Sequence, residues 1–261
     1  MRRSLMLTAV GLGMVLSLIA SPALALSLTG NYFVLAPDHP DTLGGIDGST
    51  ISGLVAPALV GGLPVYTGLI PPASGAITDL GAGNTIQWWT AHTGVTPDTS
   101  VGAGGVRADS FVGNVLGGAA FGNNFFANDL PVSADNGYRA VHWTGAFSVG
   151  AGGATLSLTA DDDAWLFLTP VNALDPLTLD NGGVKAISVA NTVSTNLVAG
   201  NYIADLFFAD RHVVQSGVAF TCEGCLDPVP EPATLLLFGT TLAGLGAVVR
   251  RRMKGQKTPE A

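Results

Sequence analysis

The chain has 261 residues, of which 35 are glycine and only 11% are charged, and its formal net charge is −8 at pH 7. The many glycines and the shortage of long polar helix formers argue against a helical protein, and the length allows one or two domains with a sizeable core. Residues 26–229 hold 17 of the 19 acids but only four of the 11 Lys and Arg. So acidic a body disfavours nucleic acid as a partner and favours cations.

The N-terminus is typical of a targeting segment. Arg2 and Arg3 precede an apolar run from Leu5 to Ala20, and Ala23-Leu24-Ala25 supplies a small-x-small cleavage site. We predict a signal peptide over residues 1–25, cut after Ala25, and therefore an exported protein.

Residues 26–226 consist of short apolar runs separated by Gly- and Pro-rich stretches, with long loops rich in Gly and Asn in the first half. The expected strands are 31–36, 139–143, 145–149, 155–160, 165–169, 184–189 and 202–209. Many short strands joined by Gly and Pro turns indicate an all-β protein, a β-sandwich or jelly-roll-like body. Helices are expected only at the two termini, as a signal helix and one C-terminal transmembrane helix.

Two strand-like runs of different texture flank an acidic run. Leu156, Leu158 and Ala160 alternate with polar residues, which predicts a half-buried strand. Residues 164–168 are apolar at every position, which predicts a strand covered on both faces.

Between these runs lie Asp161, Asp162 and Asp163, with no Lys or Arg nearby in sequence. The mutual repulsion of three carboxylates is unfavourable unless water screens it or a cation joins them. A solvated turn and a cation site are both compatible with this pattern.

Two further constellations have plain interpretations. Cys222 and Cys225 form a lone Cys-x-x-Cys, which in an exported chain predicts a local disulfide. Arg211 and His212 lie near Ser216, but no Gly-x-Ser-x-Gly elbow is present, so we expect Arg211 to pair with a body Asp and no catalytic residues.

The C-terminus carries a three-part tail. Pro230-Glu231-Pro232 precedes residues 233–249, which lack any charge, and Arg250, Arg251 and Arg252 follow. The apolar stretch is long enough for a short membrane-spanning helix, and the arginines predict a cytoplasmic tail over 253–261.

In combination, residues 229–252 resemble the PEP-CTERM sorting signal. The resemblance implies a protein anchored in the inner membrane through its C-terminal helix, recognised and processed by an exosortase, and passed on to the cell surface or beyond.

The second half of the body resembles the fibro-slime domain. The residues that carry the resemblance are the acidic run, the turn Asp180-Asn181-Gly182-Gly183, and the apolar strand that ends Ala209-Asp210-Arg211-His212. We expect this domain to cover residues 26–226.

The acidic run is also similar, more distantly, to that of protective-antigen-like lectin domains. In their sugar-binding members two adjacent Asp residues, joined by a cis peptide, hold a Ca²⁺ ion that chelates sugar hydroxyls. The resemblance implies that Asp161 and Asp162 bind Ca²⁺, with Asp163, Asp180 and Asn181 close to the same loop.

The sequence therefore predicts a non-enzymatic, exported surface or matrix protein that binds carbohydrate or exopolysaccharide with the help of calcium. Two alternatives stay open: a purely structural component without a ligand, and a polysaccharide-processing enzyme with two carboxylates across a cleft.

Overall fold

The computed structural model describes residues 25–42, 44–112, 115–116, 138–171, 175–186, 191–212 and 216–226. Within these ranges no helix is long and apolar enough to cross a membrane. The predicted signal peptide up to residue 24 and the whole sorting tail, including the predicted transmembrane helix over 233–249, lie outside the described residues.

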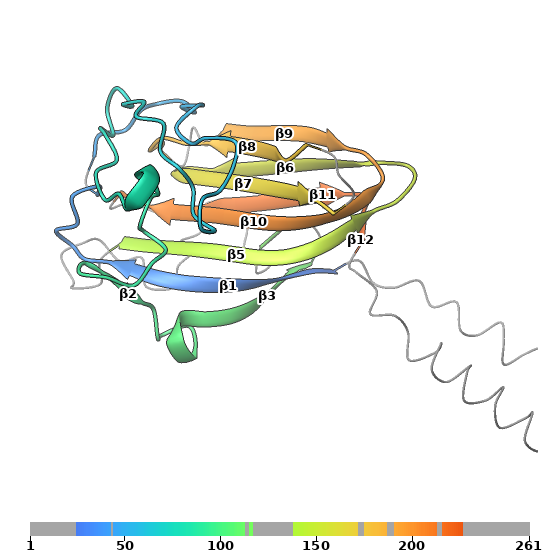
Figure 1. Cartoon of the computed structure of the whole chain (residues 1–261), viewed down its shortest axis with the longest axis horizontal. Coiled ribbons are helices and arrows are strands. Elements are labelled where there is room, and N and C mark those ends of the chain that lie inside the picture. The colour runs from blue at the N-terminus through green and yellow to red at the C-terminus, as the bar shows by residue number, and fades with distance from the viewer. Residues whose placement is uncertain are drawn as a thin grey trace, which may run out of the picture.

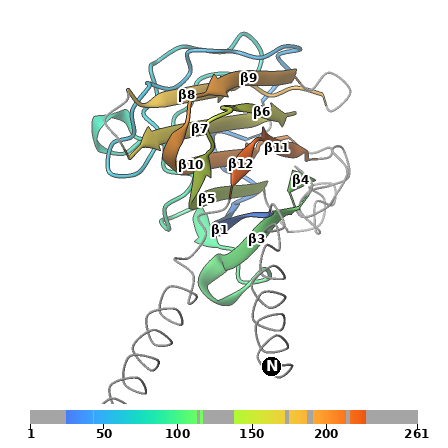
Figure 2. The same cartoon turned by 90° about the vertical axis from the view of Figure 1, so that its right-hand side faces the viewer.

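A nine-stranded antiparallel sheet forms the centre of the body, with seven strands in the order β4-β3-β1-β5-β10-β7-β8 (Figures 1 and 2). In chain order its strands are β1 (Ala25–Leu35), β2 (Val95–Pro97), β3 (Val106–Val112), β4 (Val115–Leu116), β5 (Tyr138–Val149), β7 (Asp163–Pro170), β8 (Leu177–Asn181), β10 (Gly200–Asp210) and β12 (Cys225–Leu226). The two strands outside the main order are β2, which pairs with β1, and β12, which pairs with β5.

A smaller sheet of three strands, in the order β11-β6-β9, packs against one face of the large sheet (Figure 2). Its strands are β6 (Ala154–Ala160), β9 (Asn191–Leu197) and β11 (Val218–Glu223). Leu156, Leu158 and Phe220 from the small sheet and Trp143 and Leu206 from the large one share a single buried core. The predicted all-β sandwich is confirmed.

Strands β6 and β7, on either side of the acidic residues, are buried in the patterns that their sequences predict. Alternate residues of β6 are buried, whereas β7 is buried without interruption from Asp163 to Leu168. The reason is that β7 lies between β10 and β8, with the small sheet on one face and long loops on the other.

Those loops, residues 36–42 and 44–94, form a third layer over the outer face of the large sheet (Figures 1 and 2). A second core lies between the loops and the sheet, and tryptophans from both layers meet in it. Trp88 stacks on Trp165 of β7 with ring centroids 5.9 Å apart, and Trp89 packs edge-on against Phe207 of β10.

The expected strand over 184–189 is wrong where the structure describes it. Val184, Lys185 and Ala186 are not in a strand, and β8 ends before them at Asn181. Gly183 has φ of 89°, a left-handed conformation that ends the pairing and that only glycine adopts freely. Val184 and Lys185 are buried after this turn. The mostly apolar sequence of residues 184–189 resembles that of a strand.

Strand β9 was not expected from the sequence. Residues 191–196 alternate between half-buried and exposed at the edge of the small sheet, and only Leu197 is buried, so no continuous apolar run marks the strand. Conversely, β5 is one strand from Tyr138 to Val149, where the sequence predicts two.

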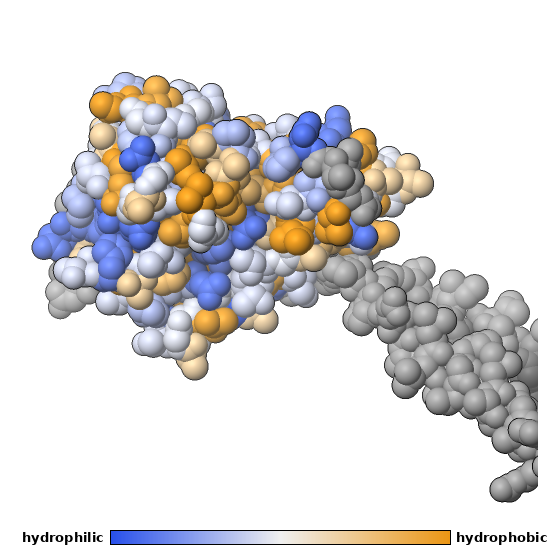
Figure 3. All heavy atoms as spheres, in the orientation of Figure 1, coloured by the Kyte–Doolittle hydropathy of each residue, from blue (hydrophilic) through white to orange (hydrophobic). Residues whose placement is uncertain are grey.

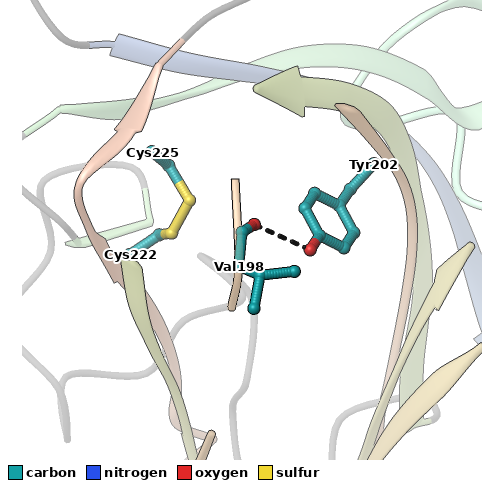
Figure 4. Close-up of a disulfide and its surroundings, with 4 residues drawn as sticks. All are labelled: Val198, Tyr202, Cys222 and Cys225. Atoms are coloured by element: carbon teal, nitrogen blue, oxygen red, sulfur yellow. Dashed lines mark hydrogen bonds between the residues drawn. A yellow bond between two sulfur atoms is a disulfide. The ribbon is translucent and has the colours of Figure 1, made fainter. Parts of the chain in front are cut away.

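Cys222 of β11 and Cys225 of β12 are joined by a disulfide (Figure 4). Nearby, the Tyr202 hydroxyl donates a hydrogen bond to the carbonyl oxygen of Val198, 2.9 Å away (Figure 4). Gly224 turns the chain between the two cysteines with φ of 94°. The disulfide thus connects the small sheet to the large one.

Mass spectrometry of non-reduced peptides from the exported protein should recover Cys222 and Cys225 in one peptide that lacks two hydrogens. Because the ring is small, replacing both cysteines by serine should cost about 2 kcal/mol at most. Free thiols in protein taken from its own envelope would contradict the pairing.

Candidate functional site

The acidic run lies at the junction of β6 and β7 and is buried. Asp161, Asp162 and Asp163 are 1%, 2% and 0% exposed. The solvated-turn interpretation is therefore wrong, because water does not reach these carboxylates. Their charge must be balanced by protein groups.

Backbone N–H groups satisfy the first two carboxylates. Asp161 Oδ1 accepts hydrogen bonds from the N–H groups of Asp162 and Gly217, both at 2.9 Å. Asp162 Oδ2 accepts from the N–H groups of Arg211 and His212 at 2.6 and 3.1 Å. These bonds fix the loop to the ends of β10 and β11.

The third carboxylate forms a fully buried ion pair. Asp163 Oδ2 is 2.6 Å from both Nε and Nη2 of Arg211, and both side chains are 0% exposed. The pairing of Arg211 with a body Asp, predicted from sequence, is confirmed. The Arg211 guanidinium also donates to the carbonyl oxygen of Asp41, contacts Ser74, and lies 5.0 Å from the ring centre of Trp88. It joins the acidic run to the loop layer.

A second cation, Lys185, approaches the same loop from its backbone side. Its ammonium donates to the carbonyl oxygens of Asp162, Asn181, Gly182 and Gly183 at 3.3, 3.4, 3.2 and 2.6 Å. Burial lowers the pKa of Lys185, and the neighbouring carboxylates, led by Asp163, oppose that shift. Sequence reasoning missed Lys185, although it is the only lysine between residues 26 and 229.

The remaining predicted ligands, Asp180 and Asn181, form hydrogen bonds with loop and strand residues. Asp180 accepts from the N–H groups of Gly53 and Leu54 and from the indole of Trp165. The Asn181 side chain donates to two backbone carbonyls and accepts from the Thr50 hydroxyl. These hydrogen bonds do not involve the carboxylates of the acidic run, although the charge of Asp163 adds to burial in raising the pKa of Asp180.

The oxygen atoms of the acidic run do not fit a calcium ion as ligands. Calcium takes 6–8 oxygen ligands, and the carboxylate oxygens named above already accept from N–H groups or from Arg211. Among the residues that the structure describes, no three His, Cys, Asp or Glu side chains are arranged to hold a metal ion. The same residues contain no cis peptide bond, so the cis Asp161–Asp162 bond that the lectin resemblance implies is wrong.

Burial raises the pKa of the first two carboxylates of the run. Burial, with the neighbouring Asp162 carboxylate as a second cause, raises the pKa of Asp161 to about 8. Burial also raises the pKa of Asp162. Asp161 is therefore largely protonated at neutral pH, which reduces the negative charge that Arg211 and Lys185 must balance.

A second group of polar side chains lies on the outer face of the large sheet. We call Thr29, Asn31, His142, Thr144 and Asp205 the polar shelf; all five are exposed or half-buried. Thr29, Thr144 and Asp205 lie opposite one another across β1, β5 and β10, and Asn31 and His142 form the next rung. The row of three spans about 10 Å, given the usual strand spacing.

Within the shelf, His142 and Asp205 form a pair. His142 Nε2 is 2.9 Å from Asp205 Oδ1, and the imidazole stacks on the buried Phe207 ring at 4.0 Å. These contacts fix both polar side chains on a rigid sheet. Figure 3 shows this side of the molecule, where hydrophilic surface lies between apolar patches. Sequence reasoning missed the shelf because its residues come from three strands far apart in the chain.

Comparison with known proteins identifies the C-terminal tail. Residues 228–252 match the PEP-CTERM protein-sorting motif, so the chain carries the signal of an exported protein that is membrane-anchored and then processed. No curated protein matches the chain.

Two solved structures are similar to the body. One is the PA14 domain of the MpAFP antifreeze protein, with 14% identity and a TM-score of 0.28 over 82% of this chain and 88% of that one. The other is TmCBM61 in complex with β-1,4-galactotriose, with 6% identity and a TM-score of 0.23. That alignment spans 34% of this chain and 62% of that chain, less than two thirds of its length.

Replacing Arg211 by Met should leave Asp163 buried without its partner and lower the free energy of unfolding by about 3–5 kcal/mol. The comparison variant is Arg107→Met, because the Arg107 side chain is 40% exposed and its buried partner Asp109 keeps hydrogen bonds from the Tyr32 hydroxyl and the Trp143 indole, so the loss should be clearly smaller. Equal losses for the two variants, measured by urea unfolding, would contradict the role given to Arg211.

The raised pKa of Asp161 predicts a pH dependence of stability. An acid with a folded pKa of about 8 and an unfolded value of 3.8 stabilises the protein fully below 3.8. That contribution is lost as the pH rises toward and through about 8. Asp161→Asn stays neutral throughout and should unfold with a smaller decline across this window. An identical decline in wild type and variant would refute the assignment.

Proposed function

We propose that this chain is a surface or matrix protein that binds carbohydrate through the polar shelf. The observation that carries the proposal is the shelf itself, where hydroxyl, amide, imidazole and carboxylate groups gather on one rigid sheet face. Such groups donate to and accept from sugar hydroxyls, and their fixed placement limits the entropy lost on binding. This proposal assigns no catalytic role to the shelf.

The sorting tail gives the shelf its setting. An exported body that is released from the membrane by an exosortase would reach the cell surface or the surrounding matrix, where exopolysaccharide is abundant. We propose inner-membrane anchoring through residues 233–249 before that processing, and we assign the body to the fibro-slime type on the motifs of its second half.

A purely structural role is the competing proposal, and a glycan screen separates the two. Full-length protein should bind a defined set of glycans on an array. Asp205→Ala should weaken the affinity about tenfold or more, because a hydrogen bond to a charged group contributes about 1.5–3 kcal/mol.

The control for this experiment is Thr155→Ala, which changes an exposed residue of β6 on the small sheet. It should leave glycan affinity unchanged. Binding that is absent in wild type, or equally weakened in both variants, would favour the structural role.

A further inference from the structure

The side-chain nitrogen of Lys185 is surrounded by oxygen atoms, as a bound cation would be. The residue is 3% exposed, and four backbone carbonyl oxygens surround its nitrogen at 2.6–3.4 Å. The carboxylates of the acidic run also act electrostatically on the ammonium and favour its charged form.

Only the charged form of lysine suits this position. An ammonium has three N–H donors and no acceptor, whereas a neutral amine would turn a lone pair toward an oxygen. The groups that contact the nitrogen are all acceptors. Backbone carbonyls and carboxylates are also the ligand types of hard metal cations.

We propose that the Lys185 ammonium is the resident cation of the acidic run, held by the kind of oxygen ligands that a hard metal cation takes. The body therefore folds and keeps this loop closed without a divalent ion. The calcium dependence implied by the resemblance to lectin domains is replaced by a charge that is covalently part of the chain.

The local backbone explains how the charge is held. The backbone N–H of Lys185 donates to the carbonyl oxygen of Asp161 at 2.5 Å. Both the main chain and the side chain of Lys185 therefore form hydrogen bonds with the acidic run. The Gly182-Gly183 turn precedes it, and an added Cβ at Gly183 would lie 2.8 Å from Ile51. The turn thus has no room for a side chain, and it brings two of the four carbonyls to the ammonium.

Thermal melting of the full-length protein tests the proposal. Wild type should melt at the same temperature in EDTA and in millimolar calcium. Lys185→Ala should melt about 10 °C lower, because it leaves buried acceptors and carboxylates without their cation. Propylammonium matches the deleted atoms and should restore part of the loss, whereas 1-propanol, of the same shape but neutral, should not.

Leu206→Ala is the control, because Leu206 is fully buried in the core between the sheets, away from the run. It should be destabilised and respond to neither additive. Equal rescue of Lys185→Ala by both additives, or rescue by neither, would overturn the proposal.

Metal binding to wild type gives a test that needs no variant. Calcium, and terbium followed by tryptophan-sensitised luminescence, should show no saturable binding to the acidic run of wild type. Wild type and Asp162→Asn should therefore give the same titration curves. Saturable binding that Asp162→Asn abolishes, or a calcium-induced rise in the wild-type melting temperature, would overturn the proposal and restore the calcium site predicted from sequence. This test stands even if Lys185→Ala does not fold.

Discussion

The buried pair of Arg211 and Asp163 is the interaction on which the arrangement of the three layers depends. Asp163 begins β7, Arg211 follows β10, and the guanidinium continues into the loop layer through Asp41 and Ser74. A buried pair of this kind adds little net free energy, but loss of one partner is costly. Its main effect is to specify how the loops lie on the sheet.

Hydrogen bonding to the loop backbone also explains why the acids of the body are almost all Asp. Asp41 accepts from the N–H groups of Thr78 and Asp79 and from the indole of Trp88, and Asp47 accepts from those of Ala73, Ser74 and Val184. A short carboxylate reaches backbone donors that a longer one would overshoot. The acidic composition therefore serves largely to fix long loops that have little regular structure of their own.

The sequence predicted the fold better than the site. Alternation in β6 and the apolar run of β7 are local patterns, so strand burial could be predicted from them. The partners of Asp161 could not, because Gly217 lies 56 residues away and contributes only a backbone N–H. Lys185 was missed for a related reason: its contacts are to carbonyls, which every residue has.

The disulfide between β11 and β12 has a mechanical consequence. The sorting tail continues from β12, which pairs with β5 over only two residues, so this strand alone would peel away easily. The Cys222–Cys225 disulfide would transmit part of any force on the tail directly to β11, which pairs with β6 over six residues. Any tension on the tail would therefore be shared between both sheets instead of acting on the last short strand alone.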